Sequence, residues 1–307
     1  MVIGESFSKS HSSLYDYDKE TNPRLSSMVS DSLLVVYDNV IAPSTSTIKA
    51  FQSIMSTYKQ EYGDDVNWYE CTTLQEVISL AGYRTIWISN QSPSGVYDNV
   101  VSEYAKLCDS TIWVGEKYKG ILKKDFDEEV INELKCLKER SYFNDEHNHF
   151  VFVHLMGSHP SFKDRYPCEF SVFTTNCYNH FPKQQREELA HYDNSILYND
   201  YVVSECLGLF NNTECIAFYF PDHGLDCYDT SESYFGHARL DIPKSIEVSK
   251  RIPFLVYMSP DYKRNNRKEA LDIIDKSTLA MNTEDLFLLL MDLLGIDYQI
   301  DELNKGL

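Results

Sequence analysis

The sequence predicts an α/β fold, a three-layer sandwich in which helices cover both faces of a mainly parallel central sheet. Short apolar runs rich in Val, Ile, Phe and Tyr recur along the chain, and amphipathic stretches separate them. This alternation is typical of a parallel sheet that is buried on both faces. No repeat, low-complexity tract or long Pro/Gly linker divides the sequence, so we expect residues 1–307 to form a single domain.

The strands and helices are expected where the apolar periodicity is clearest. The expected strands are Met1–Ile3, Leu33–Tyr37, Thr85–Ile88, Thr111–Val114, Phe150–Leu155, Cys215–Phe220 and Ile252–Met258. The expected helices are Thr47–Tyr58, Leu74–Ala81, Asp127–Arg140, Gln184–Phe210, Arg267–Ile274 and Thr283–Leu294.

The composition excludes several classes of protein. Apolar residues make up 43% and charged residues 24%, as in soluble globular proteins. A formal charge of -19 without a basic patch argues against nucleic-acid binding and against unaided adsorption to an anionic membrane. No apolar run approaches the roughly 20 residues of a membrane span. The chain opens directly into a strand without a signal peptide, so we expect that it works in the cytoplasm or is the soluble part of a longer protein. We expect it to be a monomer.

The eight cysteines include no CxxC pair, which excludes a zinc ribbon. Cys168 and Cys177 bracket a polar loop and are the one plausible local disulfide. The other six lie in separate expected elements, and we expect most of them to be reduced.

Chemically active side chains follow several of the expected strands. Glu5 follows the first strand, and Asp222 and His223 follow the sixth. Thr47 ends the run Ser44–Thr47 at the start of an expected helix. Because the carboxyl ends of parallel strands meet at one edge of a sheet, these residues can converge there. Two carboxylates, an imidazole and a hydroxyl suit Zn²⁺, which would turn the Thr47 hydroxyl into a nucleophile near neutral pH.

Two further histidines can serve the same edge. His159 lies beyond the fifth strand and His237 follows Asp222-His223 by a short loop. They could stabilise charge on a transferred group, bind a second metal or protonate a leaving oxygen. Five other histidines are expected to be solvated or structural: His11, His147, His149, His180 and His191.

The combination of motifs resembles the sulfatase-like phosphoethanolamine transferases of the alkaline phosphatase superfamily, and the likeness is collinear over nearly the whole chain. The motifs that carry it are Val2–Ser6, Ser12–Tyr17, Asn22–Leu25, Ser44–Thr47, Trp87–Gln91, His154–Pro160, Arg165–Pro167, Tyr192–Asn194, Asp222–Gly224, Phe235–His237 and Pro253–Ser259.

The resemblance implies a zinc site made of Glu5, Thr47, Asp222 and His223, with Thr47 as the nucleophile that becomes modified. It also implies that His159 and His237 contact the phosphoryl group or hold a second zinc. Members of this family transfer phosphoethanolamine from phosphatidylethanolamine to a glycan or lipid A at the periplasmic face of the inner membrane.

One motif bears on the acceptor. Asn90 and Gln91 after Trp87 resemble the branch that acts on lipooligosaccharide core heptose, lipid A and related glycans. The resemblance therefore implies that Asn90, Gln91, His159 and His237 bind substrate, and that the acceptor is lipopolysaccharide, lipooligosaccharide or another surface glycan.

The chain also departs from the family pattern. The family has an N-terminal membrane domain that this chain lacks, and Leu225 stands where members often carry Glu after Asp-His-Gly. A lysine of the colistin-resistance branch has no counterpart in Pro93–Gly95, and Pro43 and Ser53 stand where that branch has a disulfide. Cys168 and Cys177 match a disulfide loop of the family.

Other functions remain open on the same scaffold. A phosphoglycerol transferase or phosphodiesterase would use the same residues. A sulfatase is disfavoured, because the formylglycine motif of sulfatases is absent near Thr47. A non-catalytic metal- or glycan-binding module is the alternative from another class, and zinc content would separate it from the enzymes.

Overall fold

A seven-stranded sheet forms the centre of the computed structural model, which describes residues 1–93, 99–117 and 126–297. The strand order is β2-β10-β7-β1-β6-β4-β5. Strands β7 to β5 in this order run parallel, and β10 is antiparallel to both β7 and β2. The strands are β1 (Val2–Gly4), β2 (Leu34–Val36), β4 (Arg84–Ser89), β5 (Ser110–Trp113), β6 (His149–His154), β7 (Ile216–Pro221) and β10 (Leu255–Met258).

The seven expected strands are the seven strands of this sheet, which confirms the mainly parallel α/β prediction. The structure adds two small two-stranded sheets that the sequence did not predict, β3 with β11 and β8 with β9. Their strands are β3 (Asn39–Ile41), β8 (Asp226–Cys227), β9 (Phe235–Gly236) and β11 (Ala280–Asn282).

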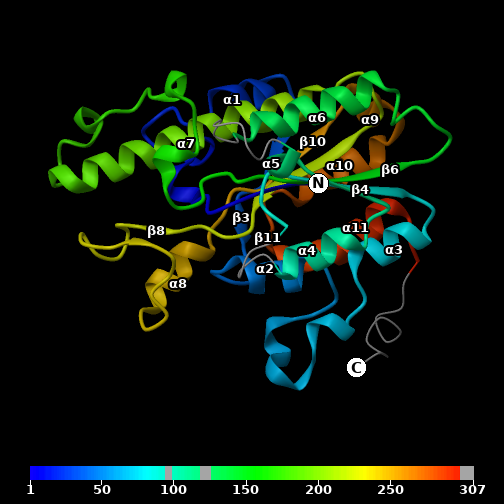
Figure 1. The fold of residues 1–307 in the computed structure, drawn as a ribbon, viewed down its shortest axis with the longest axis horizontal. Helices are drawn as coiled ribbons and strands as arrows, with labels where there is room; N and C mark the ends of the chain where they lie inside the picture. The colour runs from blue at the N-terminus through cyan, green and yellow to red at the C-terminus, as the bar shows by residue number, and fades with distance from the viewer. Residues whose placement is uncertain (94–98, 118–125, 298–307) are drawn as a thin grey trace.

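Helices cover both faces of the central sheet, α1, α6 and α7 on one side and α2, α3, α4 and α11 on the other (Figure 1). The helices are α1 (Pro23–Ser30), α2 (Thr47–Ile54), α3 (Leu74–Leu80), α4 (Asn99–Lys106), α5 (Val114–Lys117), α6 (Glu128–Glu139), α7 (Lys183–Gly208), α8 (Pro243–Lys250), α9 (Pro260–Asn265), α10 (Arg267–Lys276) and α11 (Leu286–Leu294). In the described part of the chain, no helix has the length and apolar character needed to cross a membrane.

Alternating side chains of the strands fill two separate cores. Along β4, Trp87 packs in the core under α2, α3 and α4, whereas Ile86 and Ile88 pack in the core under α6 and α7. In β6, Phe152 and Val153 divide in the same way. This period of two is what a strand buried on both faces requires. Because side chains pack against both faces of the sheet, the strands hold the loops at its carboxyl edge in defined positions.

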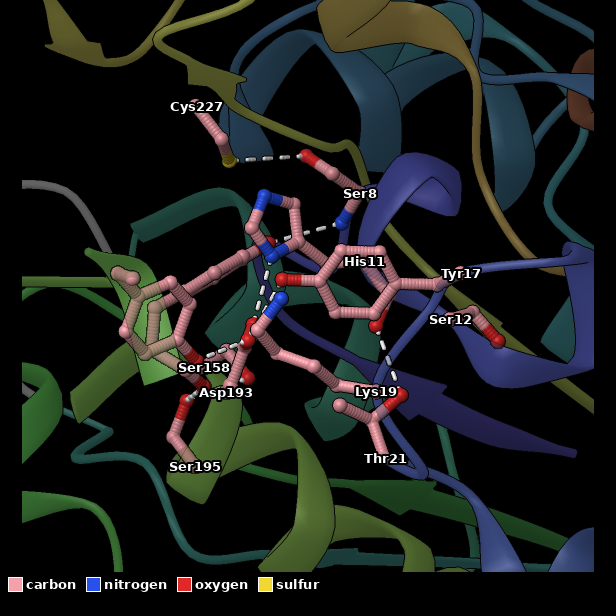
Figure 2. Close-up of polar contacts among 12 residues, drawn as sticks. Ser8, His11, Ser12, Tyr17, Lys19, Thr21, Ser158, Asp193, Ser195 and Cys227 are labelled. Carbon is pink, nitrogen blue, oxygen red and sulfur yellow. Dashed lines mark hydrogen bonds and ion pairs between the residues drawn. The ribbon is translucent and has the colours of Figure 1, made fainter. Parts of the chain in front are cut away.

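A buried polar network fastens the segment after β1 to α7. The His11 Nδ1 and Asp193 Oδ1 atoms are 2.6 Å apart, and Asp193 also accepts hydrogen bonds from the hydroxyls of Tyr17 and Tyr178. Figure 2 shows His11 between Asp193 and Cys227. Burial alone would lower the pKa of His11, but the Asp193 carboxylate, with a contribution from Cys227, raises it well above the usual value. His11 is therefore structural, and the network anchors the chain that follows the first strand.

Replacing His11 by glutamine is expected to lower the free energy of unfolding by about 3 kcal/mol at pH 6, because the variant leaves the Asp193 charge buried without its cation. The pKa of His11 is raised in the folded state, so its stabilising contribution is complete below about pH 6.5 and declines as the pH rises through the raised value. Urea unfolding of both proteins between pH 6 and 9 measures this. The stability difference should shrink toward alkaline pH, and a constant difference contradicts the charged pair.

The predicted disulfide between Cys168 and Cys177 is not formed. All eight cysteines lie in the described ranges and are free thiols. Cys168 and Cys177 belong to two separate 3-10 helices, η6 (Cys168–Phe170) and η7 (Thr175–Tyr178), and both side chains are exposed. The Cys177 sulfur lies 4.0 Å from the Thr174 hydroxyl instead of near a second sulfur.

Candidate metal centre

Three loops at the carboxyl edge of the sheet bring together Glu5, Thr47, Asp222 and His223. Glu5 directly follows β1, and Asp222 directly follows β7. These strands pair in parallel with Gly4 opposite Pro221, so the next residues, Glu5 and Asp222, leave the sheet side by side. Thr47 is the first residue of α2. Glu5, Asp222 and His223 are at most 1% exposed.

The donor atoms of these four residues have the spacing of a tetrahedral zinc site. The Thr47 hydroxyl oxygen lies 3.3 Å from Glu5 Oε2 and 3.5 Å from His223 Nε2. His223 Nε2 lies 3.5 Å from Glu5 Oε1 and 3.5 Å from Asp222 Oδ2. Four ligands held about 2.0–2.1 Å from a zinc ion lie about 3.3–3.4 Å from one another. The four side chains can therefore bind one zinc ion with little movement.

The buried carboxylates of this cluster would be stabilised by a bound cation. Burial and the negative charge of Glu5 raise the pKa of Asp222 to about 7. Burial also opposes ionisation of Glu5, but the nearby charge of His223 and a hydrogen bond from Ser6 outweigh it and lower the pKa of Glu5. For His223, burial is outweighed by Asp222 and Glu5, which raise its pKa. Two carboxylates fixed in the interior repel each other, and a divalent cation removes that repulsion.

The hydrogen bonds around the cluster leave the metal-facing atoms free. Asp222 Oδ1 accepts the backbone N–H groups of Ser6 and His223, while its buried Oδ2 atom has no hydrogen-bond partner in the structure. His223 Nδ1 lies 2.8 Å from the carbonyl oxygen of Gly224, so Nδ1 can carry the proton and Nε2 remains available as a ligand. An orphaned buried carboxylate oxygen is costly, which supports a zinc ion at this point.

Thr47 stands at a helix start suited to a phosphoryl group. The preceding residue, Ser46, makes no side-chain capping hydrogen bond to α2. The first backbone N–H groups of the helix are therefore not used by this cap, and the helix dipole favours negative charge there. The Thr47 hydroxyl thus faces the carboxylate cluster from a position where a phosphate can be stabilised.

His159 and His237 lie near the cluster but outside it. The His237 ring centroid is 4.9 Å from that of His223, and burial together with the charge of His223 lowers the pKa of His237. His159 is exposed, and its Nδ1 atom lies 3.3 Å from the Pro160 carbonyl oxygen. Among the described residues, the one group of three or more His, Cys, Asp or Glu side chains close enough to share an ion is Glu5, Asp222 and His223. A second zinc at His159 and His237 therefore stays a prediction.

Asn90 and Gln91 make hydrogen bonds to neighbouring loops. The Asn90 amide donates to Asp127, and the Gln91 amide donates to the carbonyl oxygen of Leu155. Both side chains are less than 10% exposed. Their predicted contact with substrate stays a prediction, since the contacts found here are with the protein itself.

Asp127 is a site residue that the sequence did not indicate. Its buried carboxylate accepts the backbone N–H groups of Met156 and Gly157 as well as the Asn90 amide. It thereby shapes the turn before His159. Gly157 has a φ of 53°, and a Cβ atom there would lie 2.7 Å from the Glu5 backbone nitrogen, so only glycine fits. A single aspartate at the start of an expected helix gives no signal of this role.

A mainly parallel α/β sheet with a buried cluster of Glu5, Asp222 and His223 beside a hydroxyl at a helix start is the arrangement expected of an alkaline-phosphatase-like protein. The family model described as Sulfatase matches residues 1–296, and the chain belongs to this family. It is 30% identical over 306 residues to the phosphoethanolamine transferase EptC of Escherichia coli strain K12, covering 97% of this chain and 51% of that protein. It is also 30% identical over 282 residues to the phosphoethanolamine transferase EptA of Helicobacter pylori, covering 87% of this chain and 48% of that protein.

A solved structure shows the same fold. The C-terminal periplasmic domain of EcEptC from Escherichia coli, in complex with Zn, superposes with a TM-score of 0.83 at 26% sequence identity, covering 97% of this chain and 82% of that one. The chain spans about half the length of the curated relatives it matches.

Proposed function

We propose that this domain is a zinc-dependent phosphoethanolamine transferase that works through a covalent intermediate on Thr47. The observation that carries the proposal is the 3.3–3.5 Å spacing of the hydroxyl, carboxylate and imidazole donors of Thr47, Glu5, Asp222 and His223. The transferase names of EptC and EptA, and the zinc in the EcEptC domain, support the same activity.

The residues suggest a first step in which Thr47 attacks the donor. Its Oγ1 atom forms a bond to the phosphorus of phosphatidylethanolamine, and the bond from phosphorus to the diacylglycerol oxygen breaks. When bound, zinc would lower the pKa of the Thr47 hydroxyl and offset the charge of the phosphoryl oxygens. The backbone N–H groups at the start of α2 add to this stabilisation. A neutral His237 or His159 can accept the proton of the Thr47 hydroxyl and pass it to the departing oxygen, which leaves as the hydroxyl of diacylglycerol.

In a second step an acceptor takes the group from Thr47. A hydroxyl or phosphate oxygen of the acceptor attacks the phosphorus, and the bond between phosphorus and Thr47 Oγ1 breaks, which restores the hydroxyl. A neutral His237, whose pKa is lowered, is suited to accept the proton of an attacking hydroxyl. We propose lipid A or another envelope glycan as the acceptor, and the periplasmic face of the inner membrane as the place of reaction, by analogy with the periplasmic domain of EcEptC.

Intact-mass measurement tests the proposal. The zinc-loaded protein is incubated with a short-chain phosphatidylethanolamine, and the modified residue is mapped by peptide sequencing. We expect a gain of one phosphoethanolamine group on Thr47. Modification only by phosphatidylglycerol would indicate a phosphoglycerol transferase, and hydrolysis without modification would indicate a phosphodiesterase. A protein that binds no zinc and reacts with no donor would contradict the proposal.

A further inference from the structure

We propose that Ser8 and Tyr192 are positioning residues that fix the two ligand-bearing loops of the zinc site relative to each other. The inference rests on the proposed function, because it assigns these residues a role in zinc affinity. Neither residue is a candidate metal ligand. Their hydroxyl groups instead make hydrogen bonds to backbone atoms of the loops that follow β1 and β7. They are at most 1% exposed.

Tyr192 closes the turn that carries Glu5. Its hydroxyl donates to the carbonyl oxygen of Ser6 at 2.8 Å and accepts the backbone N–H of Ser8 at 2.9 Å. Ser6 has a φ of 55°, in the left-handed region that residues other than glycine seldom adopt. One phenol thus satisfies a buried carbonyl and a buried N–H group on either side of Phe7. Without it, the turn has a strained residue and two unpaired backbone groups.

Ser8 joins this turn to the other ligand loop. Its hydroxyl donates to the carbonyl oxygen of Leu225 at 2.8 Å and accepts the Leu225 N–H at 2.6 Å. The loops pack closely here, because a Cβ atom at Gly224 would lie 3.0 Å from the Ser8 hydroxyl oxygen. Figure 2 shows Ser8 beside His11 and Cys227, and Ser8 is 1% exposed. The Ser8 contact therefore holds Glu5 and Asp222-His223 together across 217 positions of sequence.

The contacts of Leu225 also account for a departure from the family pattern. Its backbone N–H and carbonyl bind Ser8, while its fully buried side chain packs in the apolar core that includes Phe7 and Cys227. The link between the loops thus depends on the main chain at position 225 and does not need a glutamate side chain there.

The contacts of Ser8 and Tyr192 bear directly on the spacing of the site. Glu5, Asp222 and His223 are buried, and each offers a ligand atom within 4.8 Å of the others. That spacing depends on the two loops that carry these residues. Ser8 and Tyr192 hold them before the metal arrives, so zinc binds without the cost of rearranging the loops.

The test is the zinc affinity of the full chain in the variants Tyr192→Phe and Ser8→Ala, measured by competition with a chromophoric chelator. Mutating a residue that supports metal ligands through hydrogen bonds typically weakens metal binding by about 10–100-fold. We expect each variant to bind zinc more weakly by a factor in that range. Tyr198→Phe is the matched control. Tyr198 lies on the same helix, is 2% exposed, and its hydroxyl accepts a hydrogen bond from the Glu128 N–H, which belongs to neither ligand-bearing loop.

Thermal unfolding of the zinc-free proteins separates positioning from general loosening. We expect the control to lose a similar amount of thermal stability as Tyr192→Phe while keeping wild-type zinc affinity. Unchanged zinc affinity in both test variants, or an equal loss in the control, would overturn the inference. Because Ser8 and Tyr192 act on one turn, the double variant should weaken binding less than the product of the single effects; a full product would contradict a shared role. A wild-type chain that binds no zinc would instead refute the proposed function.

Discussion

Alanine at position 47 is expected to abolish covalent labelling by phosphatidylethanolamine and to reduce transfer by about 10³-fold or more, as removal of a nucleophile does in other enzymes. At the start of α2, the Thr47 hydroxyl oxygen lies within 3.5 Å of both Glu5 and His223. No other side chain in this turn of the described helix makes a hydrogen bond to the cluster. The fold should survive, since Thr47 is only partly buried.

The remaining ligands make the Thr47 result specific. Glu5, Asp222 and His223 stay in place in this variant, so zinc should still bind, with water in the fourth position. Thr45→Ala is the control, because Thr45 belongs to the same run of hydroxyl residues and lies two positions before Thr47. Intact mass, zinc content and transfer rate are measured on all three proteins. Full labelling of the Thr47→Ala protein, or loss of labelling in the control, would refute the assignment.

Replacing Asp222 by asparagine is expected to change zinc binding and zinc-free stability in opposite directions. The amide keeps an oxygen for the N–H groups of Ser6 and His223 but replaces the unpartnered Oδ2 atom. Zinc should bind about 10²–10³-fold weaker, because about 10–16 kcal/mol of zinc binding is shared among four ligands.

The zinc-free variant should gain stability. Burial and Glu5 raise the pKa of Asp222 to about 7 in the folded protein. An acid whose folded pKa lies above its unfolded value costs stability once the pH exceeds the unfolded value, so removing the charge helps at pH 8. We expect a gain of about 1 kcal/mol or more in unfolding free energy with a chelator present. Urea unfolding with and without zinc measures both effects; a loss of stability in the chelator would contradict the buried repulsion.

The central sheet could be predicted from the sequence because each of its strands is a compact apolar run. The short pairs were missed for a physical reason: β3 and β11 are three residues each and pair only because the fold brings Val40 beside Met281. Helices α1, α4, α5, α8 and α9 were also missed. They have four to eight residues each, which is too short to show a clear periodicity.

The site divides in the same way. Its candidate metal ligands are residue types that stand out at strand ends, so Glu5, Asp222 and His223 could be predicted from the sequence. Ser8 and Tyr192 could not, because a serine and a tyrosine are common and their partners are backbone atoms far away in sequence. Their role depends on tertiary packing, which a periodic pattern does not encode.

The position of β1 in the sheet constrains when the central sheet can form during synthesis of the chain. This strand is the first in the chain, yet it lies in the middle of the sheet between β6 and β7, with Val2 opposite both Val153 and Tyr219. Contacts between such distant residues form slowly, and they require both partners to have been synthesised. During translation, β1 cannot pair with both of its neighbours until β6 and β7 have been synthesised. Glu5 and Asp222 can therefore come together only after β7 has been synthesised, so a metal ion that binds both of them can bind only late in folding.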